Sequence, residues 1–193
     1  MWKINPVYPA NEAYAWSNDV FTKQELDLII NIGKNIPMRH AGVNDMGIAP
    51  PTSRRSKISW IKPSIETEFI FQKLSTAILT LNDNYFKYDL TVLEDLQFSE
   101  YDESYKGMYR NHTDDGFAAP DRKLSFSLQL TEPEEYDGGD LLLYRFRLDD
   151  PTKVQRQRGL LGIFPSWTIH EVTPVVRGTR YSLVGWVHGP RFK

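Results

Sequence analysis

The clearest structural signal in the chain is the stretch Leu124-Ser125-Phe126-Ser127-Leu128-Gln129-Leu130, in which apolar and polar residues alternate. Successive side chains of a β-strand point to opposite faces, so this stretch predicts a strand with one apolar face. Further short strands are expected at residues 141–146, 159–164, 167–172 and 179–187. Residues 136–140 and Gly178 are expected to form turns, and the charged residues 148–158 a solvated connection.

The part of the chain before these strands has helical patterns. Thr22 and Glu25 fit a capping box, which predicts a helix that begins there and ends at Gly33. Its apolar face would consist of Leu26, Ile29, Ile30 and Ile32. A longer helix is expected after Ser64, ending at residues 82–84. Its buried side would consist of Ile65, Phe69, Leu74, Ile78 and Leu81.

Helices followed by consecutive short strands predict an α+β fold, mainly β, in which a sandwich or barrel is supported by N-terminal helices. The length of 193 residues suits a single domain. We expect that domain to span 1–193, with the helical support at about 1–86 and the β core at about 87–190. Residues 39–56 lie between the helices and are expected to form either a surface loop or a substrate lid.

The composition excludes several classes of function. The net charge of −2 gives no electrostatic reason for binding nucleic acid or an anionic membrane. The chain has no cysteine, which excludes disulfides, thiolate metal sites and a cysteine nucleophile. No signal peptide is evident, and no apolar run approaches the roughly 20 residues that span a bilayer. A soluble cytoplasmic protein is therefore expected.

His112, Asp114 and His170 are the strongest candidates for a metal site. Side chains two residues apart in extended chain point to one side, so His112 and Asp114 can face the same ion. His170 comes from a distant strand and can complete a triangular face of that ion. Two imidazoles and one carboxylate, with the other positions open, form the facial triad of non-haem Fe(II) oxygenases.

These three residues also have a structural interpretation. A His-x-Asp pair can arise by chance in a chain with four histidines and 25 acidic residues. His112 would then be a loop residue capped by Asp114, and His170 a buried strand residue with a hydrogen-bonded ring. Their sequence alone does not separate this interpretation from a metal site.

Arg180 favours the metal site. It follows an expected turn at residues 176–178, on a strand that can run beside the strand of His170. Arg180, Ser182 and Trp186 share parity, so all three should point to one face. A guanidinium holds a carboxylate through two parallel hydrogen bonds, which suggests a carboxylate-bearing ligand beside the metal.

Short motifs run in a fixed order across roughly residues 95–190, about half of the chain. They are Phe98-Ser-Glu-Tyr101, Tyr109-Arg-Asn-His112-Thr-Asp114, Leu124-Ser-Phe-Ser-Leu-Gln-Leu-Thr131, Glu135-Tyr-Asp-Gly-Gly-Asp-Leu141, Phe164-Pro-Ser166, His170-Glu-Val-Thr-Pro-Val175 and Gly178-Thr-Arg-Tyr-Ser182-Leu-Val-Gly-Trp186. This ordered set resembles the prolyl 4-hydroxylase branch of the 2-oxoglutarate/Fe(II)-dependent oxygenases. It is especially similar to their PKHD-type members.

The resemblance implies a double-stranded β-helix, or jelly-roll, core. It implies that the catalytic centre consists of three iron ligands, His112, Asp114 and His170. It also implies that Arg180, where many members have lysine, binds the C5 carboxylate of 2-oxoglutarate. The other implied site residues are Tyr101 and Tyr109 in the cosubstrate pocket, Gln129 or Ser182 as a second contact to that carboxylate, and Trp186 near the substrate. Fe(II), 2-oxoglutarate and O2 are the implied cofactors, and ascorbate is left open.

The resemblance implies a dioxygenase that hydroxylates a prolyl residue in a peptide or protein and forms succinate and CO2. The same chemistry on a free amino acid or another small molecule is the first alternative. A cupin-like metal protein without oxygenase activity is a second, but such a protein needs no arginine clamp for a dicarboxylate. A catalytically dead binding module is a third, and the presence of all three ligands argues against it.

Overall fold

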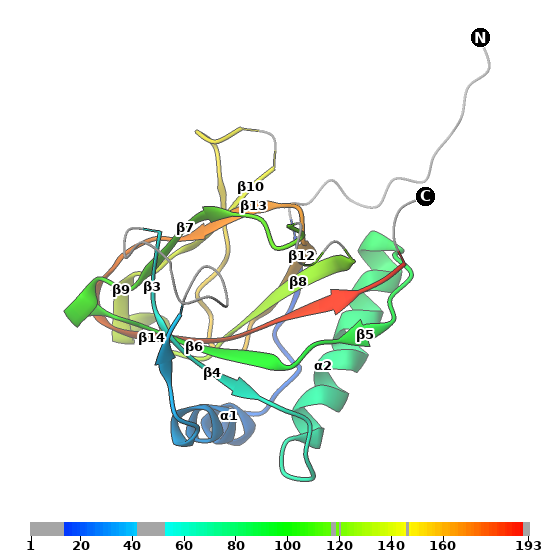
Figure 1. Ribbon diagram of the computed structural model, residues 1–193, viewed down its shortest axis with the longest axis horizontal. Helices are drawn as coiled ribbons and strands as arrows, with labels where there is room; N and C mark the ends of the chain where they lie inside the picture. The colour runs from blue at the N-terminus through cyan, green and yellow to red at the C-terminus, as the bar shows by residue number, and fades with distance from the viewer. Residues whose placement is uncertain (1–13, 42–52, 117–118, 120, 146, 191–193) are drawn as a thin grey trace.

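The computed structural model describes residues 14–41, 53–116, 119, 121–145 and 147–190. Two antiparallel sheets face each other, and two helices lie against the outer side of the larger sheet (Figure 1). The helices are α1 (Lys23–Asn35) and α2 (Glu68–Leu81). This arrangement confirms the predicted fold, a mainly β jelly-roll core with N-terminal helices. Within the described ranges, no helix is long and apolar enough to span a membrane.

The larger sheet has nine strands, in the order β1-β12-β8-β14-β6-β4-β2, with β5 and β9 also paired to β14. Their bounds are β1 (Ala15–Ser17), β2 (Arg39–His40), β4 (Lys57–Ile61), β5 (Val92–Leu93), β6 (Leu96–Asp102), β8 (Arg122–Gln129), β9 (Tyr136–Gly138), β12 (Leu161–Pro165) and β14 (Val175–His188). The sheet therefore includes strands from the N-terminal part of the chain, which the sequence patterns did not predict.

The smaller sheet has five strands, in the order β11-β10-β13-β7-β3. Their bounds are β3 (Arg54–Arg55), β7 (Met108–His112), β10 (Leu141–Tyr144), β11 (Thr152–Lys153) and β13 (Ile169–Val172). Strand β11 lies inside the segment expected to be a solvated connection. The expected end of one strand at residue 146, and residues 42–52 of the loop or lid, lie outside the described residues.

The central strands of the larger sheet have an apolar face toward the helices and a polar face toward the smaller sheet. On β8, Leu124, Phe126 and Leu128 belong to one apolar cluster with residues of both helices. The intervening Ser125, Ser127 and Gln129 are also buried. The predicted apolar face of this strand is confirmed. Its polar face does not meet solvent, because it lines the interior between the two sheets.

Helix α1 begins as predicted but does not end at Gly33. The Thr22 side chain accepts from the backbone N–H of Glu25, and the Glu25 carboxylate accepts from the N–H of Thr22, completing the capping box. The helix continues to Asn35. A Cβ atom at Gly33 would lie 2.3 Å from Cγ of Phe98 on β6. The glycine therefore permits close contact between helix and sheet, and it is not a helix stop.

Helix α2 begins later than predicted, at Glu68. A hydrogen-bonded turn precedes it, in which the Ser64 backbone N–H donates to Oγ1 of Thr67. Ile65 lies in this turn and is 91% exposed, so its expected burial is wrong. Ile70 occupies the buried position instead, and the chain continues beyond the expected end as a π-helical turn, Asn82–Phe86.

Two expected turns are parts of strands. Residues 136–138 form β9, which pairs with the first part of β14. Gly178, with a φ of +71°, lies within β14 and does not precede it. As a result, Arg180 and His170 lie on strands of different sheets, so the expectation of neighbouring strands is wrong.

Candidate metal centre

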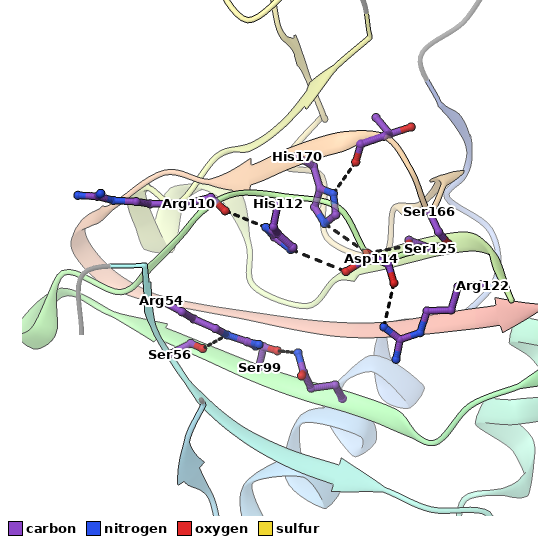
Figure 2. A network of polar contacts seen from close by, with 12 residues as sticks. Arg54, Ser56, Ser99, Arg110, His112, Asp114, Arg122, Ser125, Ser166 and His170 are labelled. Atoms are coloured by element: carbon purple, nitrogen blue, oxygen red, sulfur yellow. Dashed lines mark hydrogen bonds and ion pairs between the residues drawn. The ribbon is translucent and has the colours of Figure 1, made fainter. Parts of the chain in front are cut away.

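His112, Asp114 and His170 come together between the two sheets. Strand β7 ends at His112, which lies opposite His170 of β13 in the strand register, and the chain then bends at Asp114. One ligand atom from each side chain lies within 4.8 Å of the other two (Figure 2). Nε2 of His170 is 3.4 Å from Oδ2 of Asp114, and Nε2 of His112 is 3.8 Å from Oδ1. This donor set fits a divalent ion of the Fe(II) type.

Both imidazole rings are oriented by backbone carbonyls. Nδ1 of His112 lies 2.8 Å from the carbonyl oxygen of Arg110, and Nδ1 of His170 lies 2.9 Å from that of Thr168. If each Nδ1 carries the proton and donates to its carbonyl, each Nε2 has its lone pair free toward Asp114. This is the usual support of a metal-binding histidine.

Asp114 is held by groups from the larger sheet and its connections. Its Oδ2 accepts from Oγ of Ser125 at 2.7 Å, and its backbone N–H donates to the carbonyl of Ser166 at 2.8 Å. Nη1 of Arg122 donates to the Asp114 carbonyl at 3.3 Å. The two sheets thus meet at this carboxylate, which fixes its position relative to both histidines.

The protonation of the centre suits metal binding. Burial lowers the pKa of His112 well below its ordinary value, and the nearby His170 lowers it further. Burial alone would raise the pKa of Asp114, but His170, His112 and the Ser125 hydroxyl hold it below its usual range. His112 is therefore neutral and Asp114 ionised at neutral pH, which are the forms that bind metals.

Arg180 is buried in the same interior, with 2% of its surface exposed. Its Nη2 donates to Oε1 of Gln129 at 3.0 Å, and its Nη1 donates to Oγ of Ser182 at 3.3 Å. Its Cζ lies 5.4 Å from the centre of the Tyr101 ring. Both hydrogen-bond partners are neutral, and Nε has no partner among the described residues. A guanidinium in this state is suited to an anionic ligand.

The remaining predicted residues lie near these groups. The ring of Tyr109 stacks on that of His112, with centroids 3.5 Å apart. Burial raises the pKa of Tyr109, although Arg54 has a smaller opposing effect. Trp186 is buried, and its indole group helps to lower the pKa of Asp114. The structure therefore places every predicted site residue in the interior between the sheets.

A network beside Asp114 was not predicted from the sequence. Arg122 donates to the carboxylate of Glu94 through Nε and Nη2, at 2.5 and 2.7 Å, and His188 contacts the same carboxylate at 2.6 Å. The guanidinium of Arg122 also lies 4.0 Å from the centre of the Trp186 ring. These residues are far apart in the chain, so only the fold shows that they act together. In the sequence, the only sign of polar contacts around Asp114 was the polar residue Ser125, whose hydroxyl group donates to the Asp114 carboxylate.

A comparison with known families shows what this chain is similar to. Residues 96–188, just under half of the chain, match the model of the 2OG-Fe(II) oxygenase superfamily. Its similar curated relatives are PKHD-type hydroxylases, which confirms the resemblance seen in the motifs. The PKHD-type hydroxylase of a Synechococcus strain is 39% identical over 84 residues, which cover 41% of this chain and 37% of the relative. The match thus spans well under half of that relative's length.

Solved structures agree on the fold. The structure of a Pseudomonas putida prolyl-4-hydroxylase has a TM-score of 0.75 at 23% identity, over 93% of this chain and 94% of that chain. A prolyl hydroxylase from Trichoplax adhaerens has a TM-score of 0.76 at 18% identity, over 93% and 84% of the two chains. At these identities the likeness establishes the jelly-roll fold alone.

Proposed function

We propose that the protein is a 2-oxoglutarate- and Fe(II)-dependent dioxygenase that hydroxylates a prolyl residue in a peptide or protein. One observation carries this proposal: the His112, Asp114 and His170 side chains share a buried interior with Arg180. Tyr101, beside Arg180, and Tyr109, beside His112, pack in the same apolar cluster. A metal face and a dicarboxylate clamp in one interior meet the main binding requirements of this class of enzyme.

When bound, Fe(II) and 2-oxoglutarate would supply the chemistry in which O2 is the oxidant: one oxygen atom goes into succinate as CO2 is released, and the other goes into the hydroxyl group of the product. His112, Asp114 and His170 would hold the ion from one side and leave its other positions open. Arg180 would hold the distal carboxylate of 2-oxoglutarate, since burying that anion without a partner would cost several kcal/mol. The rings of Tyr101 and Tyr109 would keep water from the ligands.

Gln129 and Ser182 would orient Arg180 and complete the carboxylate seat. Gln129 uses its carbonyl oxygen on Arg180, so its amide N–H groups remain available. The Ser182 hydroxyl accepts from Arg180 and can donate its own proton to the same ligand. Both residues can therefore supply the second contact that the resemblance implied.

The prolyl substrate rests on kinship. The Trichoplax neighbour was solved in complex with a peptide fragment of the hypoxia inducible factor oxygen degradation domain. Another structural neighbour is a viral collagen prolyl hydroxylase, solved as a 2OG complex. Both names support a peptide over a free amino acid.

We further propose that residues 1–193 form one oxygenase domain, since Ile29 of α1 and Leu74 of α2 pack with Phe98 and Leu128.

An anaerobic titration tests the chemistry directly. Fe(II) and 2-oxoglutarate are added to the metal-free protein, and the visible charge-transfer band of the chelated cosubstrate is recorded. We expect the band in the native chain, and its absence would contradict the proposal. Succinate formation with proline-containing peptides and with free proline, each with and without ascorbate, then separates a peptide substrate from a small molecule.

A further inference from the structure

Arg54 is a second arginine that points into the interior near the metal centre. Strand β3 pairs with β7, which places Arg54 beside Tyr109 in the register. Its Cζ lies 4.5 Å from the centre of the Tyr109 ring, and that ring stacks on His112. Figure 2 shows the side chain running from β3 toward Ser99 of β6. Arg54 therefore lies two contacts from His112, one of the proposed iron ligands.

The guanidinium of Arg54 has unused hydrogen-bonding capacity. Its Nε donates to Oγ of buried Ser56 at 2.9 Å, whereas Nη2 is buried and has no partner among the described residues. Within the same residues, no carboxylate forms an ion pair with Arg54. Several other arginines do have such a partner: Arg122 with Glu94, Arg156 with Asp140, Arg158 with Asp27 and Arg177 with Asp137.

Arg54 and Arg180 thus share an uncommon state, since each points inward, lacks a carboxylate partner and has a buried nitrogen without a hydrogen bond. A guanidinium stays protonated at physiological pH, and a buried charge is unfavourable unless it is paired. In the proposed function, the anion that pairs with Arg180 is the distal carboxylate of 2-oxoglutarate. The geometry points to a second anion, which would pair with Arg54.

We infer that Arg54 binds a carboxylate of the substrate, so that the enzyme selects acidic substrates. This inference rests on the proposed function, which supplies the first anion and the reaction. The carboxylate would be an acidic side chain beside the target in a peptide, or the α-carboxylate of a free amino acid. Both present the same planar group, which can accept a charge-assisted hydrogen bond from the unpartnered Nη2 of Arg54.

Matched probes test the inference by binding, without turnover. The full chain is loaded with Mn(II) and 2-oxoglutarate, and ligands are added by calorimetric titration. One pair of capped peptides places proline between two glutamates or two glutamines, and the other pair is L-proline and L-prolinamide. The variants are Arg54→Gln, Arg54→Lys and Arg55→Gln. Arg55 is the control, because it points the other way and donates to the carbonyls of Tyr105 and Lys106.

We expect the native protein to bind the acid of one pair about tenfold or more tightly than its amide, as for a lost charged hydrogen bond. That pair identifies the source of the carboxylate. Arg54→Gln should remove the preference, Arg54→Lys should keep part of it, and Arg55→Gln should keep all of it. Arg54→Lys also keeps the test informative if Arg54→Gln fails to fold.

Three results would overturn the inference: no acid preference in the native protein, a preference that persists in Arg54→Gln, or weaker 2-oxoglutarate binding as the main effect of Arg54→Gln. Failure of the native protein to bind Mn(II) and 2-oxoglutarate would instead contradict the proposed function. The two failures are therefore distinguishable.

Discussion

Arg180 carries a permanent charge in an interior where both of its hydrogen-bond partners are neutral. Such a residue is poorly explained by packing alone, because an apolar side chain of similar size would fill the space without a desolvation penalty. The proposed carboxylate ligand would remove that penalty, and it would give a partner to Nε of Arg180, which has none among the described residues.

Arg180→Ala should therefore weaken the binding of 2-oxoglutarate much more than the binding of iron. We expect the 2-oxoglutarate concentration for half-maximal succinate formation to rise by about tenfold or more, as for a lost charged hydrogen bond. The iron requirement should change little. Arg180→Lys keeps the charge and should retain part of the affinity. Equal shifts in both requirements would indicate that Arg180 is structural.

The two histidines should act together on the metal. His112→Ala and His170→Ala each remove one ligand from a facial triad, so each should abolish tight Fe(II) binding in equilibrium dialysis together with succinate formation. His40→Ala is the control, because His40 is exposed on β2. Retained turnover in either ligand variant would contradict the assignment of the triad.

Among the elements, α1 is sensitive to the contact at Gly33. An alanine there would place its Cβ 2.3–2.7 Å from three ring carbons of Phe98. Such overpacking costs about 1–3 kcal/mol, and the better helix propensity of alanine returns only about 1 kcal/mol. Gly33→Ala should therefore lower the free energy of unfolding in urea. Gly116→Ala should not, since a Cβ there meets nothing within 4 Å; equal stability of the two variants would contradict this close contact.

The accuracy of the sequence predictions differs between local and long-range features. The capping box at Thr22 and the alternation at residues 124–130 were predicted correctly, because both depend on neighbours within a few residues. Gly33 and Gly178 were misread as a helix end and a turn. Glycine permits a turn and also a close contact or a bend within a strand, and only distant partners decide between these outcomes.

The same distinction applies to the site. His112 and Asp114 could be paired from their spacing, and strand parity gave Arg180 a direction, whereas the motif order was needed to prefer an iron site with His170 over a structural role. The contact of Arg122 with the Asp114 backbone, and the inward direction of Arg54, could not be predicted. They depend on which strands pair, and pairing joins segments that are far apart in the chain.

For the whole molecule, metal binding should raise thermal stability, because the three ligand side chains come together only in the folded state. Two of them lie on the smaller sheet, and Asp114 is hydrogen-bonded to Ser125 of the larger sheet. A ligand at about 100 times its Kd stabilises the folded state by about 2.7 kcal/mol. For a domain of this size we expect Tm to rise by about 5 °C or more with Mn(II). Scanning calorimetry with and without the ion measures this. The rise should be absent in His112→Ala, and an equal rise there would place the ion elsewhere.

The position of β14 has a consequence for biosynthesis. It lies between β8 and β6 in the larger sheet, yet it follows both of them, and all three metal ligands, in the chain. A nascent chain that stops before β14 would carry two open strand edges, which invite pairing with other chains. It would also lack Arg180. Ribosomal synthesis thus delivers Arg180, the proposed cosubstrate clamp, together with the strand that closes the sheet, so a chain that ends just before β14 has all three proposed metal ligands but lacks the clamp.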